Sequence, residues 1–199
     1  MKLKIKKEGK VESFNLINSW ADVTLSTWLQ LIDYATGTKT EEATKTLAAL
    51  TDIPKQLVKE LALSDVAVIM SKIGELQAKQ DTNLKRIIEI NEVEYGFHPD
   101  LSEISLGEYA DIEQFIKNGI DSSLPELMAV LYRPIKLKKN DIYIIDAYDG
   151  DIRLRAEEMK LMSAEQVQSA LFFFYNLGKV LSEIMPSYLM ERLQEMKTQ

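Results

Sequence analysis

Two eight-residue stretches, TLSTWLQL at residues 24–31 and SLGEYADI at residues 105–112, share one pattern at a distance of 81 residues. In each, a hydroxyl residue precedes apolar and aromatic side chains that return at helical spacing. A second pair of blocks, LAAL at residues 47–50 and MAVL at residues 128–131, matches at the same distance. Two separate blocks with one offset are harder to obtain by chance than either block alone. We therefore interpret the chain as two copies of one structural plan.

Upstream of the first pair of stretches, each copy predicts a β-hairpin. At a distance of 82 residues, Gly9 corresponds to Asn91, and both residue types tolerate the positive φ angles of a tight turn. The expected strands are Leu3–Lys7 with Lys10–Leu16 in the first copy, and Lys85–Ile90 with Glu92–His98 in the second.

About three helices are expected after each hairpin. Capping-box spacing marks helix starts at Ser105–Glu108, Ser123–Glu126 and Ser163–Gln166. The third helix expected in the first copy has a stripe of apolar residues on one side. The residues 101 positions further along the chain, in the second copy, are apolar as well. The paired positions are Val66 with Val167, Ile69 with Ala170, Met70 with Leu171, Ile73 with Phe174 and Leu76 with Leu177.

The expected fold class is α+β and predominantly helical, with two similar units that dock together. The first unit comprises residues 1–80. The second comprises residues 81–199 and carries an insertion near residues 135–154 and a C-terminal helix. The polar segment Gln77–Asn83 is the candidate linker. The alternative is two unrelated α-rich halves that share ordinary amphipathic periodicity, and the pattern leaves open whether the units share one core.

Composition narrows the classes of function. The chain has 199 residues, 46% hydrophobic and 28% charged, which is typical of one or two globular domains. The absence of cysteine excludes disulfides, thiol catalysis and cysteine-ligated zinc, and a single histidine excludes histidine-cluster metal sites. The formal net charge of −7 offers no positive footprint for phosphates, so no direct nucleic-acid binding is expected. The lysines of Met1–Lys10 are expected to form the solvated face of a strand rather than a phosphate-binding arm.

Neither a signal peptide nor a membrane span is predicted. The N-terminus lacks an apolar region behind its charges. Polar residues interrupt the most hydrophobic stretch, Ala170–Met185, which falls short of the ~20 apolar residues that a span requires. The expected location is cytoplasmic.

Candidate catalytic and metal-binding residues are few. Asp146, Asp149 and Asp151 surround Gly150, and such carboxylates either hold a divalent cation or form a solvated turn. His98 lacks an evident nucleophile or ligand partner nearby in sequence, so strand-end packing or capping by Asp100 is expected. Phosphate-cradle and nucleophile-elbow motifs do not occur. We expect no catalytic residue, no cofactor and no metal, with a cation-dependent enzyme at the Asp146–Asp151 loop as the alternative.

Aromatic and amphipathic segments indicate partner binding. Trp20, Trp28 and Tyr109 are expected in the core. Four consecutive aromatics at residues 172–175 cannot all face inward from one helix, so either a neighbouring unit covers Phe172 and Phe173 or they form a binding surface. The helix expected after Pro186 is either a partner-binding element or a lid on its own domain. The candidate partner-binding residues are Phe172, Phe173, Tyr188, Leu189, Leu193 and Met196.

A family resemblance is carried by three stretches: FHPDLSEISLGEY at residues 97–109, LMAVLYRP at residues 127–134 and ALFFFYNLG at residues 170–178. They resemble a set of small tailed-bacteriophage proteins associated with virion morphogenesis, some of them tail-assembly or structural components. The resemblance covers residues 97–183, and the first half matches only through its similarity to the second. Its motifs are structural, so it implies assembly through protein–protein contacts and supplies no catalytic residue.

The leading hypothesis is therefore a non-enzymatic bacteriophage assembly factor or virion structural component. It would act in the host cytoplasm, and a structural component would remain in the virion. The expected partners are other phage structural proteins, with a homo-oligomer as a further option and no membrane or nucleic acid. The alternative hypothesis is a phage-encoded acidic inhibitor or adaptor that binds a host protein.

Overall fold

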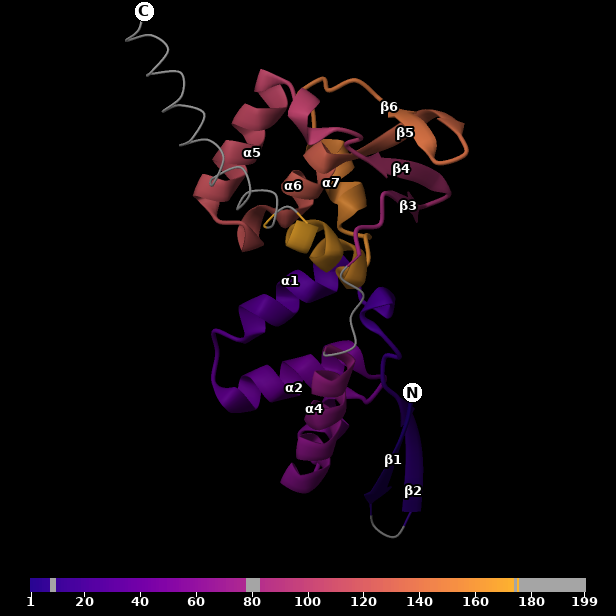
Figure 1. The fold of residues 1–199 in the computed structure, drawn as a ribbon. Helices are drawn as coiled ribbons and strands as arrows, with labels where there is room; N and C mark the ends of the chain where they lie inside the picture. The colour runs from indigo at the N-terminus through magenta and orange to yellow at the C-terminus, as the bar shows by residue number, and fades with distance from the viewer. Residues whose placement is uncertain (8–9, 78–82, 174, 176–199) are drawn as a thin grey trace, which may run out of the picture.

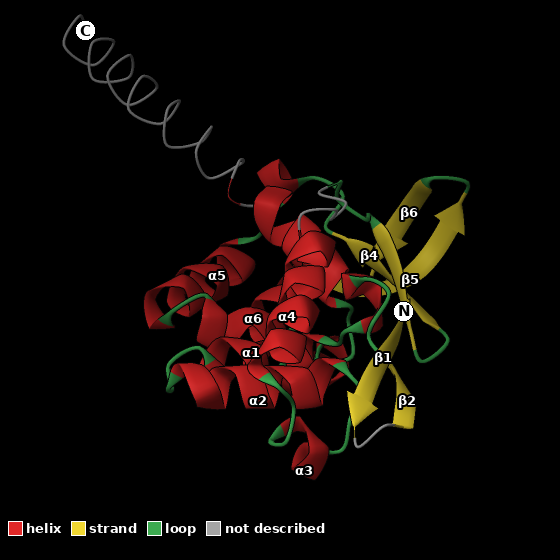
Figure 2. Ribbon diagram, turned by 90° about the horizontal axis from the view of Figure 1, so that it is seen from below, coloured by secondary structure: helices red, strands yellow, loops and turns green. Residues whose placement is uncertain are grey.

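A two-stranded sheet with the helices that follow it forms one half of the molecule, and a four-stranded sheet with its helices forms the other (Figure 1). The computed structural model describes residues 1–7, 10–77, 83–173 and 175. The α+β class is confirmed. Seen from below, the helices gather on one side and the strands of both sheets on the other (Figure 2). Among the described residues, none of the helices combines the length and hydropathy of a membrane span.

The first half begins with an antiparallel hairpin of β1 (Lys2–Lys7) and β2 (Lys10–Asn15), as predicted. Leu3 and Ile5 are buried, whereas Lys2 and Lys4, which alternate with them, are exposed, so these two lysines lie on the solvated face of the strand. The predicted turn at Gly9 lies outside the described residues. The helices of this half are α1 (Leu25–Tyr34), α2 (Lys39–Leu50), α3 (Lys55–Val58) and α4 (Leu63–Gln77).

The second half is built on a sheet with strand order β3-β4-β5-β6, antiparallel throughout. The predicted hairpin is present, with Asn91 (φ 51°) and Glu92 (φ 65°) in its turn. The β5–β6 hairpin turns at Asn140 (φ 56°), and not at Asp149-Gly150. The strands and helices are β3 (Ile87–Ile90), β4 (Val93–Phe97), α5 (Leu106–Asn118), α6 (Leu124–Leu131), β5 (Tyr132–Lys139), β6 (Ile142–Ile145), α7 (Arg153–Met159) and a helix over residues 164–173.

Two of the three predicted capping boxes form. Reciprocal hydrogen bonds join Ser105 with Glu108 and Ser163 with Gln166. The capping box predicted at Ser123 is wrong, because the short 3₁₀ turn Asp121–Ser123 runs directly into α6. This turn leaves Ser123 at φ −117°, ψ 16° rather than in the extended conformation from which a serine caps a helix.

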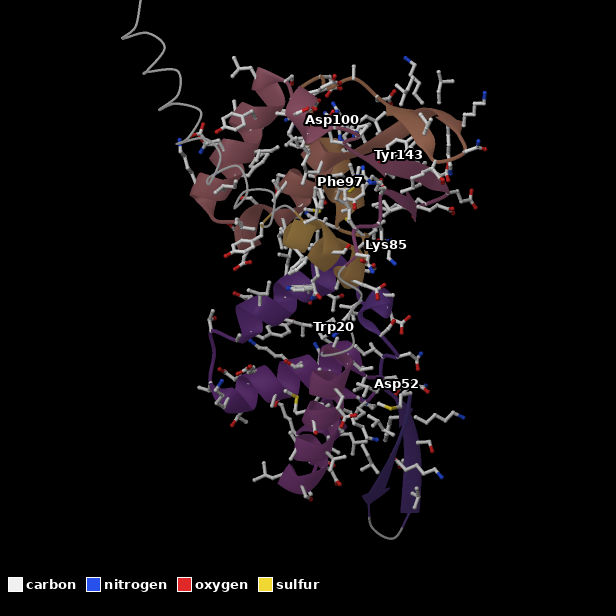
Figure 3. The ribbon with its side chains drawn as sticks, in the orientation of Figure 1. Trp20, Asp52, Lys85, Phe97, Asp100 and Tyr143 are labelled. Atoms are coloured by element: carbon white, nitrogen blue, oxygen red, sulfur yellow. The ribbon has the colours of Figure 1, made fainter. Side chains whose placement is uncertain are left out.

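The buried side chains form two clusters, each built mainly from one half, with Leu25 of α1 in the second cluster and Ala164 in the first. The ring centres of Trp20 and Trp28 lie 5.9 Å apart in the first cluster. Those of Phe97 and Tyr132 lie 5.2 Å apart in the second. Figure 3 shows Trp20 and Phe97 in these two positions. The predicted stripe of α4 packs against the first cluster and Val167, Ala170 and Leu171 against the second; Phe174 and Leu177 lie outside the described residues. The core assignment of Tyr109 is wrong: its side chain is on the exposed face of α5.

Backbone hydrogen bonds join the two halves where two helices begin. Thr24, the N-cap of α1, pairs in an antiparallel bridge with Ser163, the residue before the helix at 164–173. The amide of Leu25 donates to the carbonyl of Met162, and the amide of Ala164 donates to the carbonyl of Val23, both at 2.7 Å. The amide of Ser26 also donates to the carbonyl of Lys160, at 3.0 Å. Amides of the first helical turn have no partner within their own helix, so each half satisfies such groups of the other.

Candidate partner-binding site

A groove of about 740 Å³ opens between α2, α3 and α4. This volume lies within the ~300–1,000 Å³ range of ligand pockets. Leu47 and Val58 supply the buried part of its lining, and Leu61 and Val66 are half-buried beside them. Leu63, the first residue of α4, also lines the groove although its side chain is 86% exposed. The groove therefore presents apolar surface that the chain itself does not cover.

Lysines flank this apolar surface on two walls. Lys39 and Lys45 project from α2, while Lys55 begins α3 and Lys59 is its C-cap. All four side chains are exposed. Because each lysine carries a flexible stem, its ammonium group can follow a ligand while the stem covers apolar surface.

Two of these lysines contact a charged or aromatic side chain. The Lys39 ammonium lies 3.0 Å from a carboxylate oxygen of Glu42. The Lys45 ammonium lies 4.9 Å from the centre of the Tyr34 ring. Within the part of the chain that the structure describes, Lys55 and Lys59 form no ion pair.

Glu41 is the one acidic residue in the lining. The amide and the hydroxyl of Thr38 donate to its Oε2 at 3.2 and 3.1 Å, which completes the capping box of α2. These hydrogen bonds hold the pKa of Glu41 below its ordinary value, and the one from the Thr38 amide has the largest effect. The positive charge of Lys45 lowers the pKa further. The carboxylate therefore stays ionised, and the lining is net positive because four lysines face this one glutamate.

The sequence offers no signal for this rim. Residues 39–59 contain four lysines, but also Glu41, Glu42 and Asp52, so the segment has almost no net charge. The fold moves one of these acidic groups away: Asp52 lies at the end of β2, where its carboxylate accepts hydrogen bonds from the amide and side chain of Asn15 at 2.6 and 2.7 Å (Figure 3). Glu42 pairs with Lys39, and only Glu41 remains in the lining. A positive rim is therefore a product of chain folding and not of local composition.

The candidate partner-binding residues of the second half lie elsewhere. Phe173 packs edge-on against Phe97, with 5.5 Å between ring centres, so a neighbour within the chain covers it. Phe172 is 52% exposed. The remaining four candidates, Tyr188, Leu189, Leu193 and Met196, lie outside the described residues.

A buried ionic cluster links two of the stretches that carry the family resemblance. Arg133 is the second residue of β5, and Glu108 lies in the first turn of α5. The Nη2 of Arg133 lies 2.7 Å from Oε1 of Glu108. The Nε2 of His98 lies 3.6 Å from the same oxygen. The backbone amide of His98 donates to the carbonyl of Leu131 at 2.7 Å, which holds the residue at the end of β4. His98 is thus packed at a strand end as predicted, while Asp100 caps the following turn through Ser102.

The tyrosine of the loop after β6 closes this cluster. The ring of Tyr148 lies 5.8 Å from the guanidinium carbon of Arg133, and its hydroxyl donates to Asp111 of α5. Burial raises the pKa of Tyr148, and Asp111 reinforces the effect. His98, Glu108 and Arg133 are each at most 9% exposed. Because these side chains are buried, we interpret the cluster as a structural contact that holds α5 against the sheet.

This cluster predicts a specific pH dependence of stability. Burial, the largest effect, lowers the pKa of His98 below its ordinary value of 6.5, despite the opposing charge of Glu108. The unfolded chain then binds a proton that the folded chain resists, so the free energy of unfolding should fall as the pH drops below 6.5 toward the folded pKa. Urea unfolding between about pH 7 and about pH 5 measures this slope, which reports the proton difference between the two states.

His98 is the only histidine of the chain, which makes its variant the matched control. His98→Asn should flatten the slope in this window, because no other side chain ordinarily titrates there. Burial opposes the ionisation of Glu108, but hydrogen bonds from Ser105 and the charges of Arg133 and His98 outweigh it and lower the pKa of Glu108 below 4.5. Glu108 therefore affects the pH dependence of stability only at lower pH. An unchanged slope in His98→Asn would contradict the assignment.

The acidic loop engages neighbouring arginines. Asp149 lies 4.0 Å from Arg155, and Asp151 lies 3.4 Å from Arg153. Gly150 has φ 79°, and the amide of Asp151 donates to the Asp149 side chain, so the segment is a turn. Within residues 1–7, 10–77, 83–173 and 175, no group of three or more potential metal-ligating side chains converges.

Comparisons of the chain with protein-family models, with curated proteins and with solved structures gave no match.

Proposed function

We propose that this chain is a bacteriophage assembly factor or virion component that acts through protein–protein contacts in the cytoplasm of the infected bacterium. The observation that carries the proposal is the lysine-flanked apolar groove between α2, α3 and α4. Open apolar surface with a charged rim is typical of partner-binding sites. The phage context rests on the resemblance of the three stretches in the second half.

We further propose that the chain arose by duplication of a hairpin-and-helices unit. In the first half, Leu16 at the end of the hairpin bridges to Thr51, the C-cap of α2. At 81 residues further along, Phe97 pairs with Tyr132, the C-cap of α6. The same offset relates the starts of α1 and α5 and the ends of α2 and α6. These matches support a common plan, which the second unit extends with the β5–β6 hairpin.

A photo-crosslinking experiment tests the function. A photoreactive amino acid in place of Leu63, whose exposure makes the substitution compatible with folding, reports what occupies the groove during phage production. The same probe in place of Leu154, equally exposed on α7, is the matched control. Crosslinks from Leu63 alone to one phage protein support the proposal.

Other outcomes contradict it. A host protein as the specific crosslinked partner would favour the inhibitor or adaptor hypothesis instead. Identical crosslinks from both positions would show that the groove has no specific occupant. Mass spectrometry of purified virions then separates the two forms of the proposal, because an assembly factor leaves the particle and a structural component stays.

A further inference from the structure

We infer that the groove binds an acidic amphipathic helix of its partner, with the apolar side of that helix against α2, α3 and α4 and its carboxylates beside the lysines. This inference rests on the proposed function, because it assigns a chemistry to the partner at the same site. It commits to a protein segment, and not to a lipid or a small anion.

The lining of the groove argues for a helix. Amphipathic helices bind in grooves between helices through apolar side chains at positions i, i+3, i+4 and i+7. The groove supplies a continuous apolar strip for such anchors, from Leu47 and Val58 in its depth to Leu63 at its edge. A partner helix bound there covers the exposed Leu63 and the half-buried Leu61 and Val66, which removes apolar surface from water on both partners and favours binding.

The charges argue for an acidic partner. Four lysines line the groove against one glutamate, in a chain whose formal net charge is −7. Since Lys55 and Lys59 have no ion-pair partner among the described residues, they are available to carboxylates of another molecule. A basic segment would be repelled at this rim.

The placement of the lysines separates a helix from a lipid. Lys39 and Lys45 come from one wall, and Lys55 and Lys59 come from the other. A fatty acid has a single carboxylate at one end, which can meet only one part of such a rim. A helix with acidic residues on both sides of its apolar stripe can place carboxylates beside both walls at once.

The probe is a designed helical peptide with leucine at positions i, i+3, i+4 and i+7 and glutamate on both flanks of that stripe. A second peptide replaces every glutamate with glutamine, and a third replaces every glutamate with lysine. Fluorescence anisotropy of each labelled peptide with the full chain gives its affinity. We expect the acidic peptide to bind about tenfold more tightly than the glutamine peptide and the lysine peptide to bind weakest.

Salt provides an independent readout of the same interaction. Raising the ionic strength from about 0.1 M to about 1 M shortens the screening length from about 10 Å to about 3 Å. The affinity of the acidic peptide should fall severalfold, whereas that of the glutamine peptide should change little. An acidic peptide whose affinity is independent of salt would overturn the inference.

Variants of the chain localise the binding. Lys55→Glu/Lys59→Glu should weaken binding of the acidic peptide by about tenfold, because two attractions become two repulsions. The matched control, Lys136→Glu/Lys139→Glu on β5, makes the same change in net charge away from the groove and should leave the affinity unchanged. Leu63→Ser removes an apolar contact from an exposed position and should weaken binding about threefold. Equal weakening by both double variants would mean that overall charge, and not the groove, governs binding.

Two further ligands, one peptide and one fatty acid, decide between occupants. A peptide of residues 186–199 contains the predicted apolar side chains of the C-terminal segment, with two acidic and two basic residues. If it bound as tightly as the acidic peptide, the groove would not select its partner by negative charge. Displacement of the acidic peptide by sodium laurate at equal concentration would favour a lipid ligand and overturn the helix. In the crosslinking experiment above, a phage partner joined through a non-acidic segment would refute this inference and leave the proposed function intact. Specific crosslinks to no phage protein would refute the function itself.

Discussion

Replacing Arg133 with methionine should lower the free energy of unfolding by about 3–5 kcal/mol, the range for removing one partner of a buried ion pair. The Arg133 guanidinium lies 2.7 Å from the Glu108 carboxylate, and the two side chains are 5% and 4% exposed. Methionine fills much of the same volume but leaves the carboxylate without its counter-ion. The cost comes from a buried charge that neither water nor a neighbouring cation then stabilises.

Matched variants isolate this effect in urea unfolding at neutral pH. Adding Glu108→Gln to Arg133→Met should recover a large part of the loss, because glutamine carries no charge and can still take the capping-box position opposite Ser105. Lys117→Met removes one partner of an exposed pair, in which Lys117 and Glu113 are 65% and 51% exposed, and should change stability by less than about 1 kcal/mol. An Arg133→Met chain as stable as Lys117→Met would show that the pair contributes nothing.

Features set by local chemistry could be predicted from the sequence. Asn91 marked a hairpin turn because it tolerates positive φ, and the structure places it there. The alternation of Leu3 and Ile5 with lysines marked a one-sided strand. Ser105 and Ser163 marked helix starts because a capping box needs only residues three positions apart.

Features set by distant segments could not be predicted. Tyr109 occupies the position that corresponds to Trp28, yet Trp28 packs against the first core cluster and Tyr109 is exposed. The pattern within a helix identifies its apolar side, but the neighbouring elements determine how much of that side is covered. Ser123 fails as a cap for a related reason, since the preceding turn alters its backbone conformation.

The candidate binding groove shows the same limit more strongly. Its lysines come from two helices, while the acidic residues between them in sequence are held in a helix cap (Glu41), in an ion pair with Lys39 (Glu42) or at the end of β2 (Asp52). Its apolar lining appears in the sequence only as ordinary core periodicity. The site depends on three helices leaving one strip uncovered, and this is a property of packing that residue spacing does not contain.

The ionic cluster and the sheet meet at Gly96, the register partner of Arg133. Gly96 lies against the ring of Tyr143, a residue of β6 that Figure 3 labels. The Tyr143 hydroxyl donates to the backbone carbonyl of Phe97 at 2.7 Å, and the backbone carbonyl of Arg86 is a second acceptor at 3.2 Å. A β-carbon at Gly96 would lie 2.4 Å from Cε2 of this ring and 2.9 Å from Cγ2 of Ile145. No rotamer change at the new alanine can relieve such contacts, because a β-carbon is fixed by the backbone.

Gly96→Ala should therefore displace the Tyr143 ring and lower the free energy of unfolding by about 2–4 kcal/mol, through overpacking and loss of the hydroxyl's hydrogen bonds. The control is Gly74→Ala in α4, where an added β-carbon meets nothing within 4 Å and helix propensity favours alanine by about 1 kcal/mol. In a Tyr143→Ala background the obstructing ring is gone and only the 2.9 Å contact with Cγ2 of Ile145 remains, so Gly96→Ala should cost clearly less than in the native background. An equal cost in both backgrounds would mean that the glycine is required by something other than the tyrosine, and chemical unfolding of the four chains of this cycle measures the difference directly.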